Sequence, residues 1–348
     1  MISEPIAKEL SKEEVDEALN LHKECHVVDT HCDTLQALFN DIFPSITPLR
    51  VEEGLGKRSE KGHIDIPRLK EGGVDCQVFA IFISKTPNPP KALHRALNLV
   101  DVFYKECEKN NEDLSPTTSY NNILKAIESG KIAAMLSLEG GEALEADVSM
   151  LRIFHRLGIR MMSLTWNHRN QLADGVREER TRSGLTNLGV KVVDEMEELG
   201  IIIDVSHLSE SCFWDLVEIT DSPLIASHSN CRVLCDHPRN LTDRQIEAIA
   251  DRGGVIGMNF YPKFLRKEGQ ASVSDVVDHM EHIINLVGID HVGLGSDFDG
   301  ISSTPVGLED VSKMPNITIE LVSRGYGREE IRKILGENHL RVFSRVIG

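Results

Sequence analysis

The sequence predicts an α/β fold in which eight parallel strands close into a (β/α)8 TIM barrel. Eight short apolar, β-branched runs alternate along the chain with longer segments of helical periodicity. Strands and helices that alternate through short turns are typical of parallel strands joined by helical crossovers, and eight such units favour closure. The length of 348 residues fits one domain of this architecture, spanning residues 1–348.

The expected strands are apolar runs bounded by turn-forming or charged residues. In chain order they are CHVVDTH, VDCQVFAIFI, KIAAMLSLEG, IRMMSLTW, IIIDVSH, PLIASHS, GGVIGMNF and HVGLGSDFDG. Several of the helical segments between them end at Gly, which helix C-termini favour, and Ser209 and Thr242 are expected N-caps. The expected helices cover residues 91–110, 147–158, 187–200, 209–220, 242–253 and 272–288.

Two segments lie outside this alternation. Residues 1–24 are charged and helix-like, which predicts a helical extension before the barrel. Residues 34–67 are irregular and contain Gly and Pro, so we expect a long loop between the first strand and its helix.

Composition excludes several classes of function. The formal net charge is −17, whereas nucleic-acid and anionic-membrane binding both need a basic surface. The N-terminus has no apolar leader, and no later segment offers about 18 consecutive apolar residues. The seven cysteines are scattered without a CxxC pair, which indicates reduced thiols. We therefore expect a cytoplasmic protein that binds neither nucleic acid nor membranes.

Side chains that can bind metal, move a proton or donate a hydrogen bond stand at the ends of six of the eight runs. In barrel enzymes the C-terminal strand ends form the face that carries the active site. Side chains alternate along a strand, so His31 and Asp33 share a face, and the same alternation is expected to aim His207 and His228 at the barrel axis. The set is His31, Asp33, Glu139, Trp166, His168, His207, His228 and Asp297.

Each of these residues also has an ordinary structural explanation. A lone His after an apolar strand is more often a hydrogen-bonded structural residue than a metal ligand. Glu139 could cap the following helix, and Asp297 could occupy a turn. Their joint occurrence favours a site, because five separate strand ends would otherwise carry a ligand type by accident. Three imidazoles with three carboxylates and no thiolate suit zinc.

The number of ligands favours two metal ions. Three protein ligands suffice for one catalytic zinc, whereas His31, Asp33, His207 and His228 with a central Glu139 suffice for two Zn²⁺ per chain. Glu139 and a water or hydroxide would bridge the pair, which lowers the pKa of the water and polarises a carbonyl. Asp297 is then the expected general base and acid.

Several motifs together resemble the membrane (renal) dipeptidase family of zinc peptidases. They include DTHCDTL, SLEGGEAL, IDVSHLSE, PLIASHSNCRVLCDHPRN and HVGLGSDFDG, and the resemblance extends from about residue 25 to the C-terminus. It implies an amidohydrolase-type barrel with a dinuclear zinc centre. By this resemblance His31 and Asp33 bind one ion, His207 and His228 bind the other, and Glu139 bridges them.

The resemblance also implies that Asp297 is the acid/base residue and that Arg239 binds the substrate, through its carboxylate. From the sequence alone, an Arg in a loop is more often solvated. Mammalian members carry a His directly after the Leu-Thr of the fourth strand, where this chain has Trp166, with His168 two residues on. Trp166 and His168 are both expected substrate contacts, with rim packing as the alternative for Trp166.

The sequence therefore predicts a metal-dependent dipeptidase, and the family implies tolerance of a D-residue on the C-terminal side. Two alternatives stay open. Another amide or lactone hydrolase on this barrel usually has HxH on the first strand and often a bridging Lys on the fourth, and this chain has neither. The second alternative is a non-catalytic metal-binding barrel, which would have lost a ligand or the proton carrier, and this chain has all of them.

A homodimer also stays open. Asp29 is expected to be a buried residue that orients a metal ligand.

Overall fold

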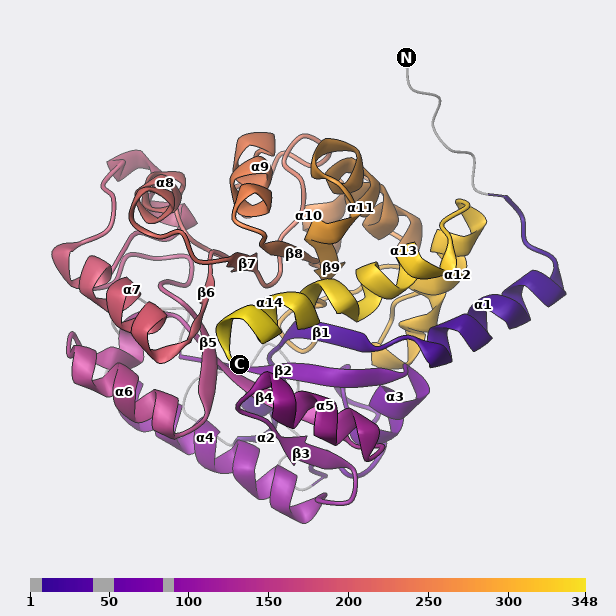
Figure 1. Cartoon of the computed structure of the whole chain (residues 1–348), viewed down its shortest axis with the longest axis horizontal. Helices are drawn as coiled ribbons and strands as arrows, with labels where there is room; N and C mark the ends of the chain where they lie inside the picture. Colours follow the sequence, from indigo (N-terminus) through magenta and orange to yellow (C-terminus); the bar gives the residue numbers. More distant parts are fainter. Residues whose placement is uncertain (1–7, 40–52, 84–90) are drawn as a thin grey trace.

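The computed structural model of the chain describes residues 8–39, 53–83 and 91–348, and in these residues eight parallel strands close into a barrel (Figure 1). Each strand pairs with its neighbours around the ring, and the β2–β4 and β1–β9 pairings close it. The expected (β/α)8 architecture is therefore confirmed. The strands are β1 (Val27–Cys32), β2 (Val74–Phe82), β4 (Ile132–Glu139), β5 (Ile159–Ser163), β6 (Ile202–Asp204), β7 (Leu224–Ala226), β8 (Val255–Met258) and β9 (Val292–Leu294).

A ninth strand, β3 (Leu114–Pro116), has no counterpart in the sequence-based expectation. It pairs with Ile132–Ala134 at the start of β4, while β5 pairs farther along the same strand. A short strand that ends in Pro is typical of a sheet edge, because Pro cannot donate to the ladder.

The expected helices all form, and they surround the barrel (Figure 1). Ser209 and Thr242 are N-caps as predicted, since their side chains accept hydrogen bonds from the backbone N–H groups of Cys212 and Gln245. In the part of the chain that the structure describes, no helix combines the length and apolarity needed to cross a membrane. The expected helices are α4 (Ala92–Lys109), α6 (Val148–Arg156), α7 (Asn187–Leu199), α8 (Glu210–Ile219), α9 (Asp243–Asp251) and α11 (Val273–Val287).

The N-terminal extension forms one helix, α1 (Lys12–Glu24), which packs against α12 (Pro315–Ser323). The expected loop at residues 34–67 is wrong in part, because α2 (Thr34–Leu38) follows β1 directly and α3 (Ile66–Glu71) begins inside the range. Residues 40–52 of that range lie outside the described residues. The other helices are α5 (Tyr120–Glu128), α10 (Pro262–Leu265) and α13 (Arg328–Arg332).

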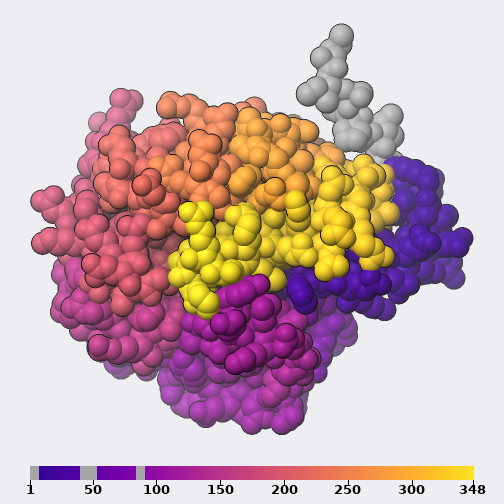
Figure 2. Space-filling model, in the orientation of Figure 1, coloured from indigo at the N-terminus to yellow at the C-terminus, as the bar shows by residue number. Residues whose placement is uncertain are grey.

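The C-terminal helix α14 (Asn338–Val346) closes one end of the barrel. Leu340 and Phe343 of this helix pack with Val28, Met135 and Ile225 in a cluster of residues from the barrel interior. Figure 2 shows the C-terminal segment across the centre of this face, which the N-terminal ends of the strands form. The opposite end of the barrel is therefore the end that can hold a site.

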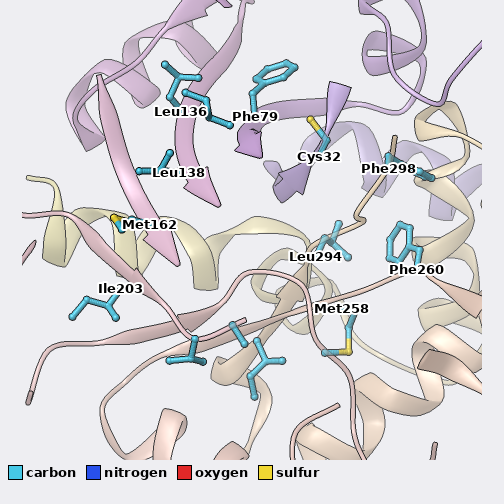
Figure 3. Packing of buried hydrophobic residues seen from close by; sticks show 14 of the residues in the cluster. Cys32, Phe79, Leu136, Leu138, Met162, Ile203, Met258, Phe260, Leu294 and Phe298 are labelled. Atoms are coloured by element: carbon cyan, nitrogen blue, oxygen red, sulfur yellow. The ribbon is translucent and has the colours of Figure 1, made fainter. Parts of the chain in front are cut away.

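Side chains of each strand alternate between the barrel interior and a layer under the helices. On β4, Met135 lies in the interior cluster, while Leu136 and Leu138 lie in the layer between strands and helices. Figure 3 shows part of this layer, including Leu136, Leu138 and Met162. Glu139 continues the inward set, so the alternation directs its carboxylate toward the barrel axis.

Candidate active site

The expected metal ligands converge at the C-terminal end of the barrel. His31 Nε2 lies 3.6 Å from Asp33 Oδ2 and 3.6 Å from Glu139 Oε2. On the other side of Glu139, His207 Nε2 lies 3.0 Å from Oε1 and 2.8 Å from His228 Nε2. All five side chains are buried. The structure thus brings together residues from four strand ends that are far apart in the sequence.

Backbone hydrogen bonds join the end of β1 to the segment after β9. The Asp297 N–H donates to the His31 carbonyl (3.1 Å), and the Asp33 N–H donates to the Phe298 carbonyl (2.9 Å). Asp29 is buried as expected, but its carboxylate accepts hydrogen bonds from Ser296 N–H (2.8 Å) and Oγ–H (2.6 Å). Asp29 therefore fixes the turn that carries Asp297, and its carboxylate does not bond to a ligand side chain.

The expectation that alternation along the strands aims His207 and His228 at the barrel axis is wrong. Ile203 and Leu224, which strict alternation would group with them, lie in the layer between strands and helices. β6 ends at Asp204 and β7 ends at Ala226, so both histidines stand in loops beyond their strands. His207 adopts a left-handed φ of 69°, which non-glycine residues adopt rarely and mostly at constrained sites. Loop conformation, and not the pleat, turns these side chains toward Glu139.

Hydrogen bonds at Nδ1 determine which ring nitrogen of each histidine is available to a metal ion. His207 Nδ1 lies 2.8 Å from Asn167 Oδ1, an acceptor, so Nδ1 carries the proton. Ser227 Oγ donates to Asp204 Oδ2 (2.6 Å) and lies 2.7 Å from His228 Nδ1, so this Nδ1 is a donor too. Both Nε2 atoms then carry a lone pair, which a metal ion beside Glu139 could accept.

Asn167, Ser227 and Asp204 hold the rings of candidate ligands in place, and the sequence did not predict them. Asp204 offered a signal, because it is an ionisable residue inside the apolar run IIIDVSH. Asn259, which donates to Asp297 Oδ2 (2.8 Å), and Gln36, which donates to Asp33 Oδ1, were missed as well. Gln36 follows Asp33 by three residues at the start of α2, a spacing typical of helix N-termini.

The electrostatics of the cluster fit divalent metal ions. Burial raises the pKa of Glu139 well above its usual range, and Asp33 adds to this effect. Burial lowers the pKa of His31, but the Glu139 and Asp33 carboxylates outweigh it and raise the value to about 10. His31 Nε2 and Glu139 Oε2 are buried and have no hydrogen-bond partner among the described residues. Crowded carboxylates and unpartnered buried atoms are what a cation would neutralise and satisfy.

Two overlapping sets of three ligand atoms meet the spacing of a metal site. His31, Glu139 and His228 form one set, and His31, Asp33 and Asp297 form the other, with all ligand atoms of a set within 4.8 Å of one another. Burial lowers the pKa of His207 and His228 well below the usual range, so both rings are neutral, as metal ligation requires.

A cavity of about 580 Å³ opens above this cluster, and both Trp166 and Arg239 line it. Arg239 is buried, and its Nη2 donates to the His228 carbonyl (3.1 Å), while its Nε has no partner in the part of the chain that the structure describes. Burial lowers the pKa of Arg239 to about 10, which still leaves a full positive charge at neutral pH. A buried guanidinium beside the cluster is suited to bind an anionic group.

The structure separates the two residues expected as substrate contacts. Trp166 lies on the cavity wall, with its ring centre 5.3 Å from that of Phe82 and 5.8 Å from that of His207. His168 is not among the described residues that line the cavity. Its ring lies 5.9 Å from the Trp166 ring, and its Nε2 lies 3.4 Å from Arg177 Nη1.

Comparison with known proteins gives a family match over almost the whole chain. Residues 15–347 match the model of the family described as membrane dipeptidase, peptidase family M19. An uncharacterised dipeptidase of Schizosaccharomyces pombe, C965.12, is 34% identical over 360 residues, covering 97% of this chain and 84% of its own length. The dipeptidase aclJ of Aspergillus oryzae is 33% identical, covering 82% of this chain and 70% of its own length.

Solved structures agree with the family match. A metallopeptidase from Rhodobacter sphaeroides, bound to a phosphinate mimic of the dipeptide L-Ala-D-Ala, is 30% identical with a TM-score of 0.84, covering 92% of this chain and 99% of its own. The dipeptidase AC, a metallopeptidase of family M19, is 30% identical with a TM-score of 0.85, covering 93% of this chain and 99% of its own. From its barrel, its site and these similarities, this chain belongs to the membrane dipeptidase family, peptidase family M19, and is a metal-dependent dipeptidase.

Proposed function

We propose that two zinc ions serve the hydrolysis of free dipeptides at this site. His31 and Asp33 would hold one ion, His207 and His228 the other, and Glu139 both. The observation that supports this most is the convergence of these side chains around the unpartnered buried atoms His31 Nε2 and Glu139 Oε2. When bound, such a metal pair acidifies a water molecule and polarises the carbonyl of the peptide bond.

Asp297 is the proposed general base and acid. Its side chain stands within the ligand cluster, and Asn259 holds its Oδ2 by a hydrogen bond of 2.8 Å. Burial raises the pKa of Asp297 to about 6, which is close to neutral pH and so suits a group that both accepts and returns a proton. Asp297 would take the proton of the attacking water and deliver it to the leaving amine.

Arg239 is the proposed anchor for the terminal carboxylate of the dipeptide, because its guanidinium is buried at the cavity and its Nε is unpartnered. Trp166 would form the wall beside the substrate, and a direct contact from His168 stays a prediction. The cavity volume lies within the range of small-molecule sites. The L-Ala-D-Ala mimic bound by the Rhodobacter sphaeroides relative supports acceptance of a D-residue at the second position.

The first test is metal analysis of the purified protein together with dipeptide hydrolysis. We expect two zinc ions per chain and hydrolysis of both L-Ala-L-Ala and L-Ala-D-Ala, with loss of activity after chelation and recovery on adding zinc. If protein that holds two metal ions hydrolyses no dipeptide, another amide or lactone hydrolase becomes the better assignment.

Substitution separates metal binding from proton transfer. Asp297→Asn should retain the metal ions but lose turnover by roughly 10²- to 10⁴-fold, the usual contribution of general acid–base catalysis. His207→Ala should instead lower the metal content. Metal analysis and kcat measured on the same preparations distinguish the two variants, and full turnover in Asp297→Asn would refute the role of Asp297.

A further inference from the structure

Two cationic side chains on the cavity wall have no part in the chemistry described above. Arg177 belongs to the loop between β5 and α7, and Lys263 belongs to α10; both line the cavity that contains the metal cluster. We call this pair the rim cations. The Arg177 guanidinium lies 5.8 Å from the centre of the Trp166 ring, and Lys263 Nζ lies 5.9 Å from the centre of the Tyr261 ring. Both are exposed to solvent.

The rim cations differ from two arginines that lie near them in the chain. Arg169, in the same loop as Arg177, is paired with the buried Asp174 through both its Nε and its Nη2. Arg266, just after α10, lies 3.1 Å from Asp275. Among the described residues, neither rim cation has a carboxylate within 4.0 Å. Of these four cations, the two that do not line the cavity are ion-paired, and the two that line it are not.

Acidic residues on the cavity wall are confined to the catalytic cluster. Of the described residues that line the cavity, only Asp33, Glu139 and Asp297 carry carboxylates, and all three belong to the proposed metal and proton-transfer site. No lining carboxylate remains to receive a basic substrate side chain. Outside the catalytic cluster, the charged residues of the cavity wall are therefore cationic, in a protein whose formal net charge is −17. A local reversal of sign of this kind attracts anionic ligands.

The cavity wall has more cations than the single carboxylate of a neutral dipeptide needs. Its one terminal carboxylate is assigned to the buried Arg239, whose guanidinium lies 5.7 Å from the Phe264 ring centre. Lys263 precedes Phe264 on α10, and Arg177 stands on a different loop with Trp166. Arg239 is buried, whereas both rim cations are exposed on the cavity wall, so a second carboxylate can be received at the rim.

We propose that this dipeptidase prefers dipeptides with an acidic side chain, Asp or Glu, and that Arg177 and Lys263 recognise the side-chain carboxylate. This inference rests on the proposed hydrolysis of dipeptides and names the class of substrate for the same site. Exposed ion pairs contribute up to about 1 kcal/mol, so each rim cation should raise kcat/KM for an acidic substrate by up to roughly five-fold.

The test compares isosteric substrates on the zinc-loaded enzyme. L-Ala-L-Glu is compared with L-Ala-L-Gln, and L-Glu-L-Ala with L-Gln-L-Ala, so that each pair differs only in the charge of one side chain. We expect a higher kcat/KM for Glu than for Gln in at least one pair, and a smaller ratio at high salt because screening weakens exposed charge interactions. L-Ala-L-Ala is the reference substrate.

Variants assign the preference to the rim cations. Lys263→Met and Arg177→Met should each reduce the Glu/Gln ratio, and the double variant should bring it to about one. Lys125→Met, on the exposed surface of α5 at the opposite end of the barrel, is the control and should keep the wild-type ratio and rate. Equal rates for Glu and Gln in the wild type, or a ratio that survives in the double variant, would overturn the inference. Failure to hydrolyse any dipeptide, L-Ala-L-Ala included, would overturn the proposed function and this inference with it.

Discussion

Ser227 illustrates how a single hydroxyl group can determine the proton position on a proposed metal ligand, His228. Its proton goes to Asp204 Oδ2, so its oxygen can only accept from His228 Nδ1, and His228 Nε2 is left with a lone pair. Asp204 is itself held by the backbone N–H groups of Ser206 and Ser227, each at 2.9 Å. Hydrogen bonds from Asp204 through Ser227 to His228 therefore orient the His228 ring.

Ser227→Ala should weaken metal binding and leave the fold intact. Without the hydroxyl, His228 Nδ1 loses its acceptor, and loss of such an outer partner typically costs 10- to 100-fold in metal affinity. The measurement is a zinc titration against a competing chelator, with circular dichroism to verify folding. Ser137→Ala is the matched control, since Ser137 Oγ is buried two residues before Glu139 and has no hydrogen-bond partner. Equal affinity for zinc in the two variants would contradict the role of Ser227.

At the scale of the elements, the seam between β1, β7 and β9 depends on close backbone contact. Thr30 Oγ on β1 contacts the carbonyl oxygens of both Ser227 (2.7 Å) and Leu294 (2.9 Å). A Cβ atom added at Gly295 would lie 1.8 Å from the Ser227 carbonyl oxygen. Glycine is required at residue 295, because only a residue without a side chain lets the end of β9 approach the residue before His228.

Gly295→Ala should therefore displace the segment that carries Asp297. Overpacking of this kind costs roughly 1–3 kcal/mol, and here the obstacle is backbone that cannot rotate away. Urea denaturation and kcat should both show a loss. Gly327→Ser is the control, since the nearest contact of its Cβ atom would be the Glu330 side chain at 3.5 Å, and Ser suits this N-cap position of α13. An unaltered free energy of unfolding in Gly295→Ala would show that the backbone can shift to accept a Cβ atom at residue 295, and would contradict the requirement for glycine.

At the scale of the whole molecule, buried neutral histidines join segments that are distant in sequence. His22 on α1 contacts Thr318 Oγ (2.7 Å) and the Gly72 carbonyl (2.9 Å), and His279 on α11 contacts the Leu265 carbonyl (3.0 Å). His339 on α14 contacts the Leu294 carbonyl at 3.1 Å. Burial lowers the pKa of all three, and that of His339 reaches about 3.

These lowered pKa values predict loss of stability in mild acid. Below the ordinary value of 6.5 the unfolded chain gains a proton at His339, whereas the folded chain does not until about pH 3. The contribution is therefore fully present above pH 6.5 and is lost as the pH falls. Between pH 7.5 and 5.5 the loss from His339 alone is about 1.4 kcal/mol by linkage.

His339→Gln offers a direct measurement, because Gln retains a donor for the Leu294 carbonyl but does not titrate. Urea denaturation at pH 7.5 and 5.5 should show that the variant loses about 1.4 kcal/mol less free energy of unfolding than the wild type. The other histidines titrate in both proteins, so the difference isolates His339. An identical loss in the two proteins would mean that His339 is protonated in the folded state.

The sequence by itself determined the barrel and most of the residues of the candidate site. Apolar runs and helical segments follow local periodicity, which is why the eight strands and the N-caps at Ser209 and Thr242 were predictable. The ligand types also stand at strand ends in the sequence, and parallel strands bring those ends to one face whatever the intervening residues are.

Only the tertiary structure decided how the site is oriented and completed. The orientation of His207 and His228 depends on loop backbone beyond the strands, so a pattern of alternation could not predict it. The partners of the ligands, such as Asn167 for His207, come from other loops and follow no sequence spacing. Which cations line the cavity also required coordinates. Local periodicity is encoded residue by residue, whereas hydrogen-bond partners and charge pairs depend on which loops the closed barrel brings together.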